Sequence, residues 1–207
     1  MAERSANEAV MGRIFCVMGK SATGKDHIFR RLLDNGELGL EKIVSYTTRP
    51  IRRGETEGKE YHFTDEEGFE KLKAAGKVIE TRVYETVLGP WRYFTVDDGL
   101  DPEKNYLIIG TLEQFIALRD YFGEARAVAL YIEVDDGERL QRALKRERKQ
   151  EVPKYAEMCR RFLADDEDFS EDKLEKEGIV NRFENAELDM CVRELEEFIK
   201  GDLKAQE

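Results

Sequence analysis

The sequence has few cysteines, no excess of basic residues and no long hydrophobic run, and each absence excludes a class of protein. Three widely spaced cysteines among 207 residues exclude a disulfide framework or a zinc cluster and predict buried thiols in a reducing compartment. A net charge of −11 argues against a general nucleic-acid binder, because such proteins need a broadly basic face. No apolar segment approaches the roughly 20 residues that span a bilayer. We therefore expect a cytoplasmic protein that binds neither nucleic acid nor a membrane.

The chain does contain an alternation of strand-like and helix-like segments. Hydrophobic residues make up 41% of it, which is enough for a substantial core. Short apolar runs predict strands at 14–18, 106–109 and 127–132, and a weaker one at 179–183. Apolar residues with helical spacing follow at 26–33, 111–121, 138–148 and 189–200. This order predicts an α/β fold with a mostly parallel sheet between helices.

Two polar stretches interrupt the alternation. Residues 45–98 predict an inserted lobe, and residues 139–164, broken by Pro153, predict a mobile helical lid. We expect one domain over 11–207, whose core is formed by 11–44, 99–138 and 165–207. Residues 1–10 form an N-terminal extension that lacks the basic start and apolar middle of a secretory signal. A core with two appendages suits a protein that closes two substrates away from water.

A phosphate-binding loop follows the first predicted strand. Residues 19–25 match the pattern G-x-x-x-x-G-K and lead directly into a predicted helix. The glycines let backbone N–H groups point at phosphate oxygens, while the helix dipole and the lysine add positive charge. An ordinary glycine turn is the alternative, which the strand–loop–helix context disfavours. The predicted ATP-binding residues are Gly19, Ser21, Ala22, Thr23, Gly24, Lys25 and Asp26.

Asp26 departs from this loop pattern, which normally places a Ser or Thr there to offer a hydroxyl to Mg²⁺. A carboxylate beside a triphosphate is unfavourable unless a cation lies between them. One interpretation is therefore that Asp26 binds Mg²⁺ directly. The other is that an acidic residue stabilises the first turn of the helix. We expect Mg²⁺ as the cofactor, with ATP as co-substrate.

A second anion site is predicted downstream, where three arginines fall within five residues, 49–53. A positive cluster in an acidic chain suggests an anionic target, because guanidinium groups bind phosphate through two hydrogen bonds. The hydroxyls of Ser45 and Tyr61 can reach the same phosphate. A solvated basic loop paired with neighbouring glutamates is the alternative.

Residues 45–63, with the pattern S-x-T-T-R-x-x-R-x-G-E-x-x-G-x-x-Y-x-F, resemble the nucleotide-binding signature of the guanylate kinase family. The resemblance implies a P-loop NTPase core and transfer of the ATP γ-phosphoryl group to GMP. It implies that the GMP phosphate is held by Ser45, Arg49, Arg52 and Tyr61. It also implies that Glu80 accepts hydrogen bonds from the guanine N1–H and 2-amino groups, a donor pair that adenine lacks. Tyr93 is the nearest match to a further base-site tyrosine, after an apparent insertion that contains Pro90 and Trp91.

The predicted lid is strongly basic, with six basic residues and one acidic residue between 139 and 149. A solvated helix with buried aliphatic stems is one interpretation. The resemblance favours a lid whose arginines neutralise the transferring phosphoryl group. It implies a catalytic set formed by Lys25, Arg146, Arg148 and Arg161, and an adenine contact from Asn185. The acidic run 165–168 is predicted to be a solvated loop.

One departure from the family concerns the strand at 106–109, which should lead into an Asp-x-Asp segment. This chain has Gly110 and Thr111 there and no acidic residue before Glu113. We hypothesise that Asp26 replaces the lost carboxylate near the metal. Both departures also resemble ribose 1,5-bisphosphate phosphokinases, so a sugar-phosphate kinase is an alternative function. A non-catalytic GMP-binding module is another, and the expected assembly is a monomer or homodimer.

Overall fold

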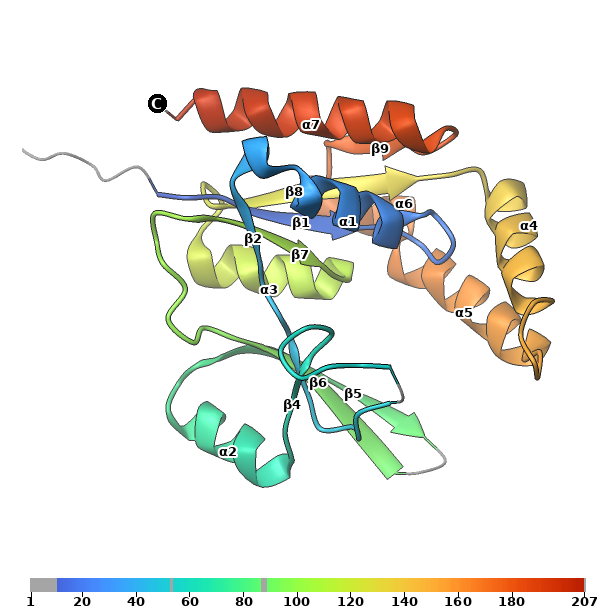
Figure 1. The fold of residues 1–207 in the computed structure, drawn as a ribbon, viewed down its shortest axis with the longest axis horizontal. Helices are drawn as coiled ribbons and strands as arrows, with labels where there is room; N and C mark the ends of the chain where they lie inside the picture. The colour runs from blue at the N-terminus through green and yellow to red at the C-terminus, as the bar shows by residue number, and fades with distance from the viewer. Residues whose placement is uncertain (1–10, 53, 87–88, 207) are drawn as a thin grey trace, which may run out of the picture.

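The computed structural model describes residues 11–52, 54–86 and 89–206 and shows a parallel-sheet core with two attached parts (Figure 1). The core sheet has the order β2-β7-β1-β8-β9, and every neighbouring pair is parallel. Its strands are β1 (Ile14–Met18), β2 (Leu40–Lys42), β7 (Asn105–Ile109), β8 (Ala127–Glu133) and β9 (Arg182–Glu184). The predicted α/β class is confirmed. No helix in the described ranges is long and apolar enough to cross a membrane.

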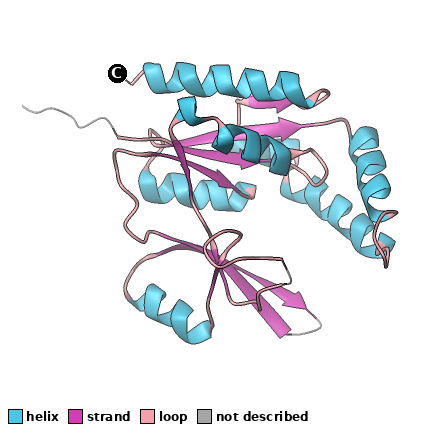
Figure 2. Ribbon diagram, in the orientation of Figure 1, coloured by secondary structure: helices cyan, strands magenta, loops and turns pink. Residues whose placement is uncertain are grey.

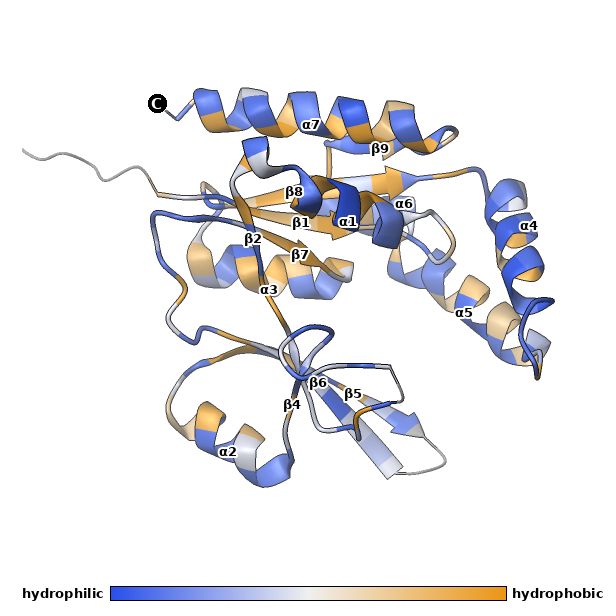
Figure 3. Ribbon diagram, in the orientation of Figure 1, coloured by the Kyte–Doolittle hydropathy of each residue, from blue (hydrophilic) through white to orange (hydrophobic). Residues whose placement is uncertain are grey.

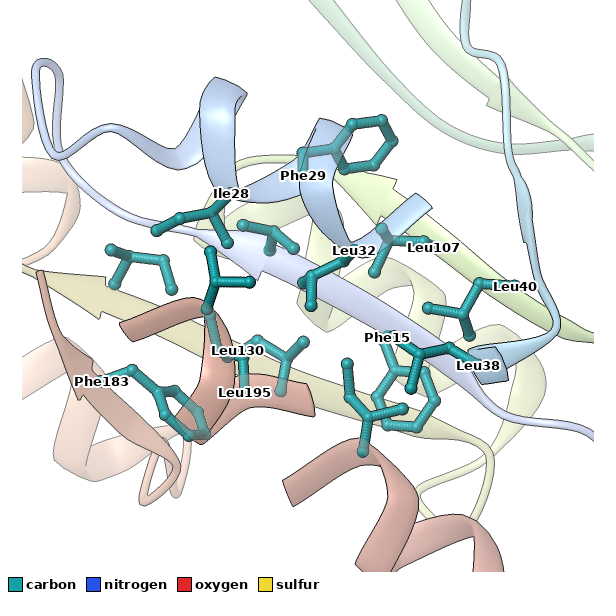
Figure 4. Packing of buried hydrophobic residues seen from close by; sticks show 14 of the residues in the cluster. Phe15, Ile28, Phe29, Leu32, Leu38, Leu40, Leu107, Leu130, Phe183 and Leu195 are labelled. Carbon is teal, nitrogen blue, oxygen red and sulfur yellow. The ribbon is translucent and has the colours of Figure 1, made fainter. Parts of the chain in front are cut away.

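Helices cover both faces of this sheet, because the strands are apolar on both sides. Alternate β1 residues, Phe15 and Val17, pack in one cluster with helices α1 (Lys25–Asp34) and α7 (Leu188–Lys204) (Figure 4). Cys16 lies in the opposite cluster, with α3 (Leu112–Phe122) and α6 (Glu171–Lys176). A short 3₁₀ helix, η1 (Gly36–Leu38), leads into the edge strand β2. The helices cover the two faces of the sheet, and the carboxyl ends of the strands continue into the connecting loops. Ligands bind at this edge in parallel sheets of this kind.

The small lobe, residues 45–98, is built on a second sheet with the order β4-β3-β6-β5 (Figure 2). Its strands are β3 (Tyr46–Thr47), β4 (His62–Phe63), β5 (Val78–Thr86) and β6 (Gly89–Val96). Helix α2 (Glu66–Ala74) covers one side through a small core of Phe69, Phe94 and Val96. Pro90 and Trp91, taken from the sequence as an apparent insertion, are part of β6 and pair with β5.

Helices α4 (Asp136–Glu147) and α5 (Tyr155–Asp168) pack against each other beside the core (Figure 1), and we call this pair, which contains the segment predicted to be a lid, the lid hairpin. Residues 148–154, which contain Pro153, separate the two helices. Hydrophobic residues gather on the central sheet, whereas α4 is mostly hydrophilic (Figure 3). Arg139 nevertheless has no exposed surface, while Leu140 beside it is 41% exposed. Helix α4 therefore turns Arg139, and not Leu140, toward the protein interior.

Several sequence expectations need correction. The last strand begins at Arg182 and not at Ile179, because α6 ends at Lys176 and is followed by a turn at Gly178 with φ 67°, directly after which Ile179 is buried. Strands β2 and β6 and helix α6 were not predicted. Cys16 and Cys191 are buried as expected, but Cys159 is exposed on α5. The predicted extension at 1–10 lies outside the described residues.

Candidate active site

The phosphate loop connects the end of β1 to the start of α1, and its backbone conformation requires both glycines. Gly19 has φ 150°, and a Cβ there would lie 2.5 Å from the carbonyl oxygen of Ile132. Gly24 has φ 87°, and a Cβ there would lie 2.5 Å from Nδ2 of Asn185. Ala22, with φ 66°, also adopts the left-handed conformation, which is uncommon outside glycine. The loop thus has the tightly wound backbone that the predicted phosphate-binding pattern requires, and phosphate binding itself stays a prediction.

The side chains of Lys25, at the end of the loop, and of Asn185, directly after β9, both bond to carbonyl oxygens of this turn. Lys25 Nζ donates to the carbonyl oxygen of Lys20 at 3.2 Å. Burial lowers the pKa of Lys25, and the nearby carboxylates of Asp26 and Asp165 partly oppose that shift. Asn185 is buried and its Nδ2 donates to the carbonyl oxygen of Thr23 at 2.7 Å. Asn185 therefore shapes the loop, and its predicted adenine contact stays a prediction.

The lid hairpin is bonded directly to the phosphate loop. Asp165 Oδ2 accepts a hydrogen bond from the backbone N–H of Ser21 at 2.7 Å, and Asp166 Oδ1 accepts one from Lys20 Nζ at 2.7 Å. The prediction of a solvated acidic loop at 165–168 is wrong, because these residues end α5, and the first two of them, Asp165 and Asp166, bind the basic, N–H-rich loop. Arg139 completes the contact by donating to the Ser21 carbonyl oxygen at 3.2 Å and stacking 4.5 Å from the Phe162 ring centroid.

A pocket of about 230 Å³ lies between α4, α5 and the phosphate loop. Its lining includes Ser21, Arg146 and Arg161. Arg161 Nε donates to Glu157 at 2.8 Å, which fixes the side chain at the rim. Arg148 is exposed and does not line this pocket. The structure thus brings together two of the three predicted lid arginines beside the loop and leaves the third outside.

Strands β5 and β6 form a hairpin that carries polar side chains on one face. Glu80 pairs with Thr95 and Arg82 pairs with Tyr93, so these four residues share a side of the sheet. We call this side the Glu80 face. Tyr93 connects it to Arg49, whose Nε donates to the Tyr93 hydroxyl at 3.1 Å. Arg49 and Tyr93, two of the residues predicted to bind GMP, are therefore hydrogen-bonded to each other.

Arg49 is 3% exposed and lies among aromatic rings, 5.1 Å from the ring centroid of Tyr61. Its Nη1 and Nη2 donate to the Glu55 carboxylate at 2.7 and 2.6 Å. These hydrogen bonds lower the pKa of Glu55 to about 2. Arg52 lies farther out, 5.7 Å from the ring of Trp91, with its backbone N–H bonded to Glu55. The predicted phosphate-binding residues Arg49 and Tyr61 are brought together, whereas Arg52 faces the hairpin.

Glu80 belongs to a hydrogen-bond chain that reaches the core. Its carboxylate accepts from Arg82 Nε at 3.0 Å and from the Thr95 hydroxyl at 2.7 Å. Thr95 accepts from Gln114 Nε2 at 2.8 Å, and the same nitrogen lies 3.4 Å from the hydroxyl of Ser45. Sequence reasoning missed Arg82 and Gln114. The spacing of two residues from Glu80 along a strand was the signal that could have found Arg82.

Gln114 also explains the glycine that stands where the Asp-x-Asp segment was expected. A Cβ at Gly110 would lie 2.5 Å from Oε1 of Gln114 and 3.3 Å from Sγ of Cys16. Gln114 is 1% exposed in the first turn of α3. A neutral amide thus fills the space at the end of β7, so this strand contributes no carboxylate to the site.

Carboxylates that could hold a metal are sparse. No group of three or more His, Cys, Asp or Glu side chains within the described ranges could bind a metal ion. Asp26 is exposed in the first turn of α1, directly after Lys25. Mg²⁺ is commonly held by one or two carboxylates together with substrate phosphates. The residues present fit a cation that arrives with a nucleotide.

Comparisons with known proteins agree with this geometry. A family model described as guanylate kinase matches residues 11–201. The chain is 44% identical over 73 residues to a guanylate kinase of Mycoplasma pneumoniae, covering 35% of this chain and 30% of the relative. It is 42% identical over 90 residues to a guanylate kinase of Neisseria gonorrhoeae, covering 44% of this chain and 42% of the relative. The matches thus span less than half of each of these two proteins.

A solved structure extends the similarity over nearly the whole chain. The crystal structure of guanylate kinase from Anaplasma phagocytophilum has a TM-score of 0.65 to this chain at 20% identity. The match covers 94% of this chain and 87% of that one. At this identity the structural similarity establishes the fold alone.

Proposed function

We propose that this chain, which belongs to the guanylate kinase family, transfers the γ-phosphoryl group of ATP to GMP and forms ADP and GDP. One observation carries the proposal. The phosphate loop with Lys25 stands at the end of β1, while a separate lobe presents Arg49 and Tyr61 together with the buried carboxylate of Glu80. Two anion sites and one base-reading group on a single chain are what a nucleoside monophosphate kinase requires.

On the donor side, the loop N–H groups and Lys25 bind the ATP phosphates, and Asn185 lies next to the adenine. The Lys25 ammonium, which burial makes costly to keep charged, gains a partner when the triphosphate enters. Asp26 is the residue that would hold Mg²⁺, which when bound neutralises charge between the β- and γ-phosphates. The free thiols of Cys16, Cys159 and Cys191 suit the reducing cytoplasm.

On the acceptor side, Ser45, Arg49, Arg52 and Tyr61 bind the GMP phosphate, and Tyr93 supports Arg49. Glu80 accepts hydrogen bonds from guanine. Arg146 and Arg161 neutralise charge as the phosphoryl group passes between the two sites, and Arg148 joins them when the lid closes. No general base is required, because the acceptor phosphate is already an anion at neutral pH. The enzyme works as a monomer or homodimer.

The proposal is tested by coupled ADP release with ATP and Mg²⁺, offering GMP, AMP, dGMP and ribose 1,5-bisphosphate separately. We expect GMP-dependent turnover, and a fall of about 10²- to 10³-fold in Lys25→Ala, because one preorganised charge on the phosphates is lost. Lys200→Ala, which removes an exposed lysine on α7, is the control and keeps wild-type turnover.

Other outcomes of this assay would replace the proposal. Turnover with the sugar bisphosphate alone would assign a sugar-phosphate kinase. No turnover with any acceptor, together with saturable GMP binding in calorimetry, would assign a binding module. Asp26→Ser tests the metal role separately, because unchanged turnover and Mg²⁺ dependence would exclude direct ligation by Asp26.

A further inference from the structure

Arg82 occupies the middle of the Glu80 face, between the groups proposed to bind the base and the phosphate. It follows Glu80 by two residues on β5 and pairs with Tyr93 across the hairpin. Its side chain is 17% exposed. Burial raises the pKa of Tyr61, and the positive charge of Arg82 is among the nearby charges that oppose this rise. Arg82 is thus close to both ends of the acceptor site.

The hydrogen bonds of Arg82 imitate those of guanine. Its Nε and Nη2 donate side by side to Oε2 and Oε1 of Glu80, at 3.0 and 3.3 Å. Guanine presents the same pair of parallel donors through N1–H and its 2-amino group. The guanidinium group therefore occupies Glu80 in the manner expected of the base.

Arg82 and guanine cannot both keep these positions. A carboxylate offers about four acceptor positions. Arg82 takes two of them and the Thr95 hydroxyl takes a third. Guanine needs two, so at least one of these three hydrogen bonds has to break when the base binds, and Arg82 makes two of the three. A released guanidinium stays tethered on the same face of β5.

Guanine offers Arg82 a new acceptor in this position. O6 is adjacent to N1–H and, together with N7, forms the acceptor pair that arginine reads most often. Thr95 cannot readily supply the hydrogen bond to O6, because its hydroxyl donates to Glu80 and accepts from Gln114. In the described ranges, no residue accepts a hydrogen bond from Nη1 of Arg82, so this donor is free to turn toward O6.

We propose that Arg82 is a specificity-determining residue, which occupies Glu80 in the free protein and donates to guanine O6 when GMP binds. The inference rests on the proposed function, since it assumes that GMP is the acceptor. It adds a second point of discrimination to Glu80, because adenine carries an amino group, a donor, where guanine carries O6.

The test pairs a change in the protein with a change of one substrate atom. Calorimetry measures the Kd of GMP and of 6-thio-GMP, in which a weakly accepting sulfur replaces O6. For wild type we expect 6-thio-GMP to bind about 10-fold more weakly, because a charge-assisted hydrogen bond is lost. In Arg82→Ala we expect the ratio of the two Kd values to fall to about 1. The ratio is insensitive to any separate effect of freeing Glu80.

Two further variants complete the design. Arg30→Ala removes an exposed arginine on α1 and keeps the wild-type ratio. Arg82→Lys keeps one charged donor and retains part of the preference for oxygen. An unchanged ratio in Arg82→Ala overturns the inference, even if both ligands bind more weakly, because Arg82 would then act through Glu80 alone. Failure of wild type to bind GMP at all would instead refute the proposed function, and this inference with it.

Discussion

At the scale of single residues, the site is dominated by charged side chains that already have partners. Arg49 is the clearest case, since Glu55 accepts from two of its nitrogens and Tyr93 from a third. Neutralisation by Glu55 allows a guanidinium to be buried among Tyr61 and Phe63, where an unpaired charge would be strongly unfavourable. The arginine predicted to bind phosphate is therefore held in one orientation before any phosphate arrives.

The Glu55 pair makes stability depend on pH in a defined window. The pKa of Glu55 is lowered from 4.5 to about 2 in the folded protein. Its contribution is thus fully present above pH 4.5 and is lost as the pH falls toward 2. We expect Glu55→Gln to lower the thermal unfolding midpoint at pH 7 and to approach wild type near pH 2.5. Glu67→Gln, at an exposed pair on α2, is the control. An equal deficit at both pH values would contradict the prediction.

At the scale of elements, the lid hairpin is tied to the phosphate loop through α5. Asp165 holds a backbone N–H of the loop, and the buried Arg139 braces α4 against both α5 and Ser21. The lid therefore has a defined position relative to the loop, set by hydrogen bonds and not by apolar packing alone. That position places a carboxylate where the nucleotide's negative charge is expected.

Asp165→Asn should consequently strengthen ATP binding. Removing one negative charge within a few ångströms of the triphosphate relieves repulsion, which corresponds to about a 3- to 10-fold lower KM for ATP. Steady-state kinetics at saturating GMP measures this value. Glu167→Gln makes the same change of charge at an exposed position on the same helix and serves as the control. A KM that stays constant or rises in Asp165→Asn would show that the Asp165 contact does not compete with ATP.

At the scale of the whole molecule, Gln114 connects the core to the small lobe. Gln114 belongs to α3 of the core, and its side chain donates to the Thr95 hydroxyl of the lobe, which in turn donates to Glu80. The chain of hydrogen bonds crosses the junction between the two sheets, so the same contacts set the orientation of the lobe and of the carboxylate that we propose to bind the base. A change in the core can therefore alter recognition of the acceptor.

We expect Gln114→Leu to raise the KM for GMP while leaving the KM for ATP unchanged, because the phosphate loop does not depend on this connection. The buried Thr95 oxygen loses its donor, which should reduce the free energy of unfolding by about 1–3 kcal/mol. Kinetics with each substrate varied in turn, together with urea unfolding, measures both effects. Gln141→Leu, at an exposed position on α4, is the control. Equal increases in both KM values would indicate a general loss of structure instead.

Much of this architecture can be predicted from the sequence. The buried strands are continuous apolar runs, and the helices that follow them have clear spacing, so β1, β7, β8 and their helices lie within a few residues of their predicted ranges. The phosphate loop can also be identified from the sequence, because two glycines and a lysine at this spacing between a strand and a helix are typical of phosphate-binding loops. Sequence patterns therefore predict those elements whose structure depends on residues near one another in the chain.

Contacts between distant segments could not be predicted in this way. Nothing near Asp165 in the sequence indicates that it binds Ser21, 144 residues away. Arg139 and Leu140 have opposite exposures from those that their polarity predicts, because ion pairs with Asp136 and Asp166 allow the arginine to be buried. The sequence did not indicate β6, because Pro90 and Trp91 resemble an insertion next to Tyr93.

Arg49 pairs with Glu55, the backbone N–H of Ser21 with Asp165, and Glu80 with Arg82, so groups proposed to bind substrates have partners within the chain. No buried side-chain nitrogen or oxygen in the described parts of the chain lacks a hydrogen-bond partner. A ligand that enters therefore displaces an internal counterpart of similar chemistry, and the number of hydrogen bonds changes little. Affinity becomes a small difference between two well-satisfied states. We therefore expect ligands of both proposed sites to leave readily, since the internal partners restore the hydrogen bonds that are lost.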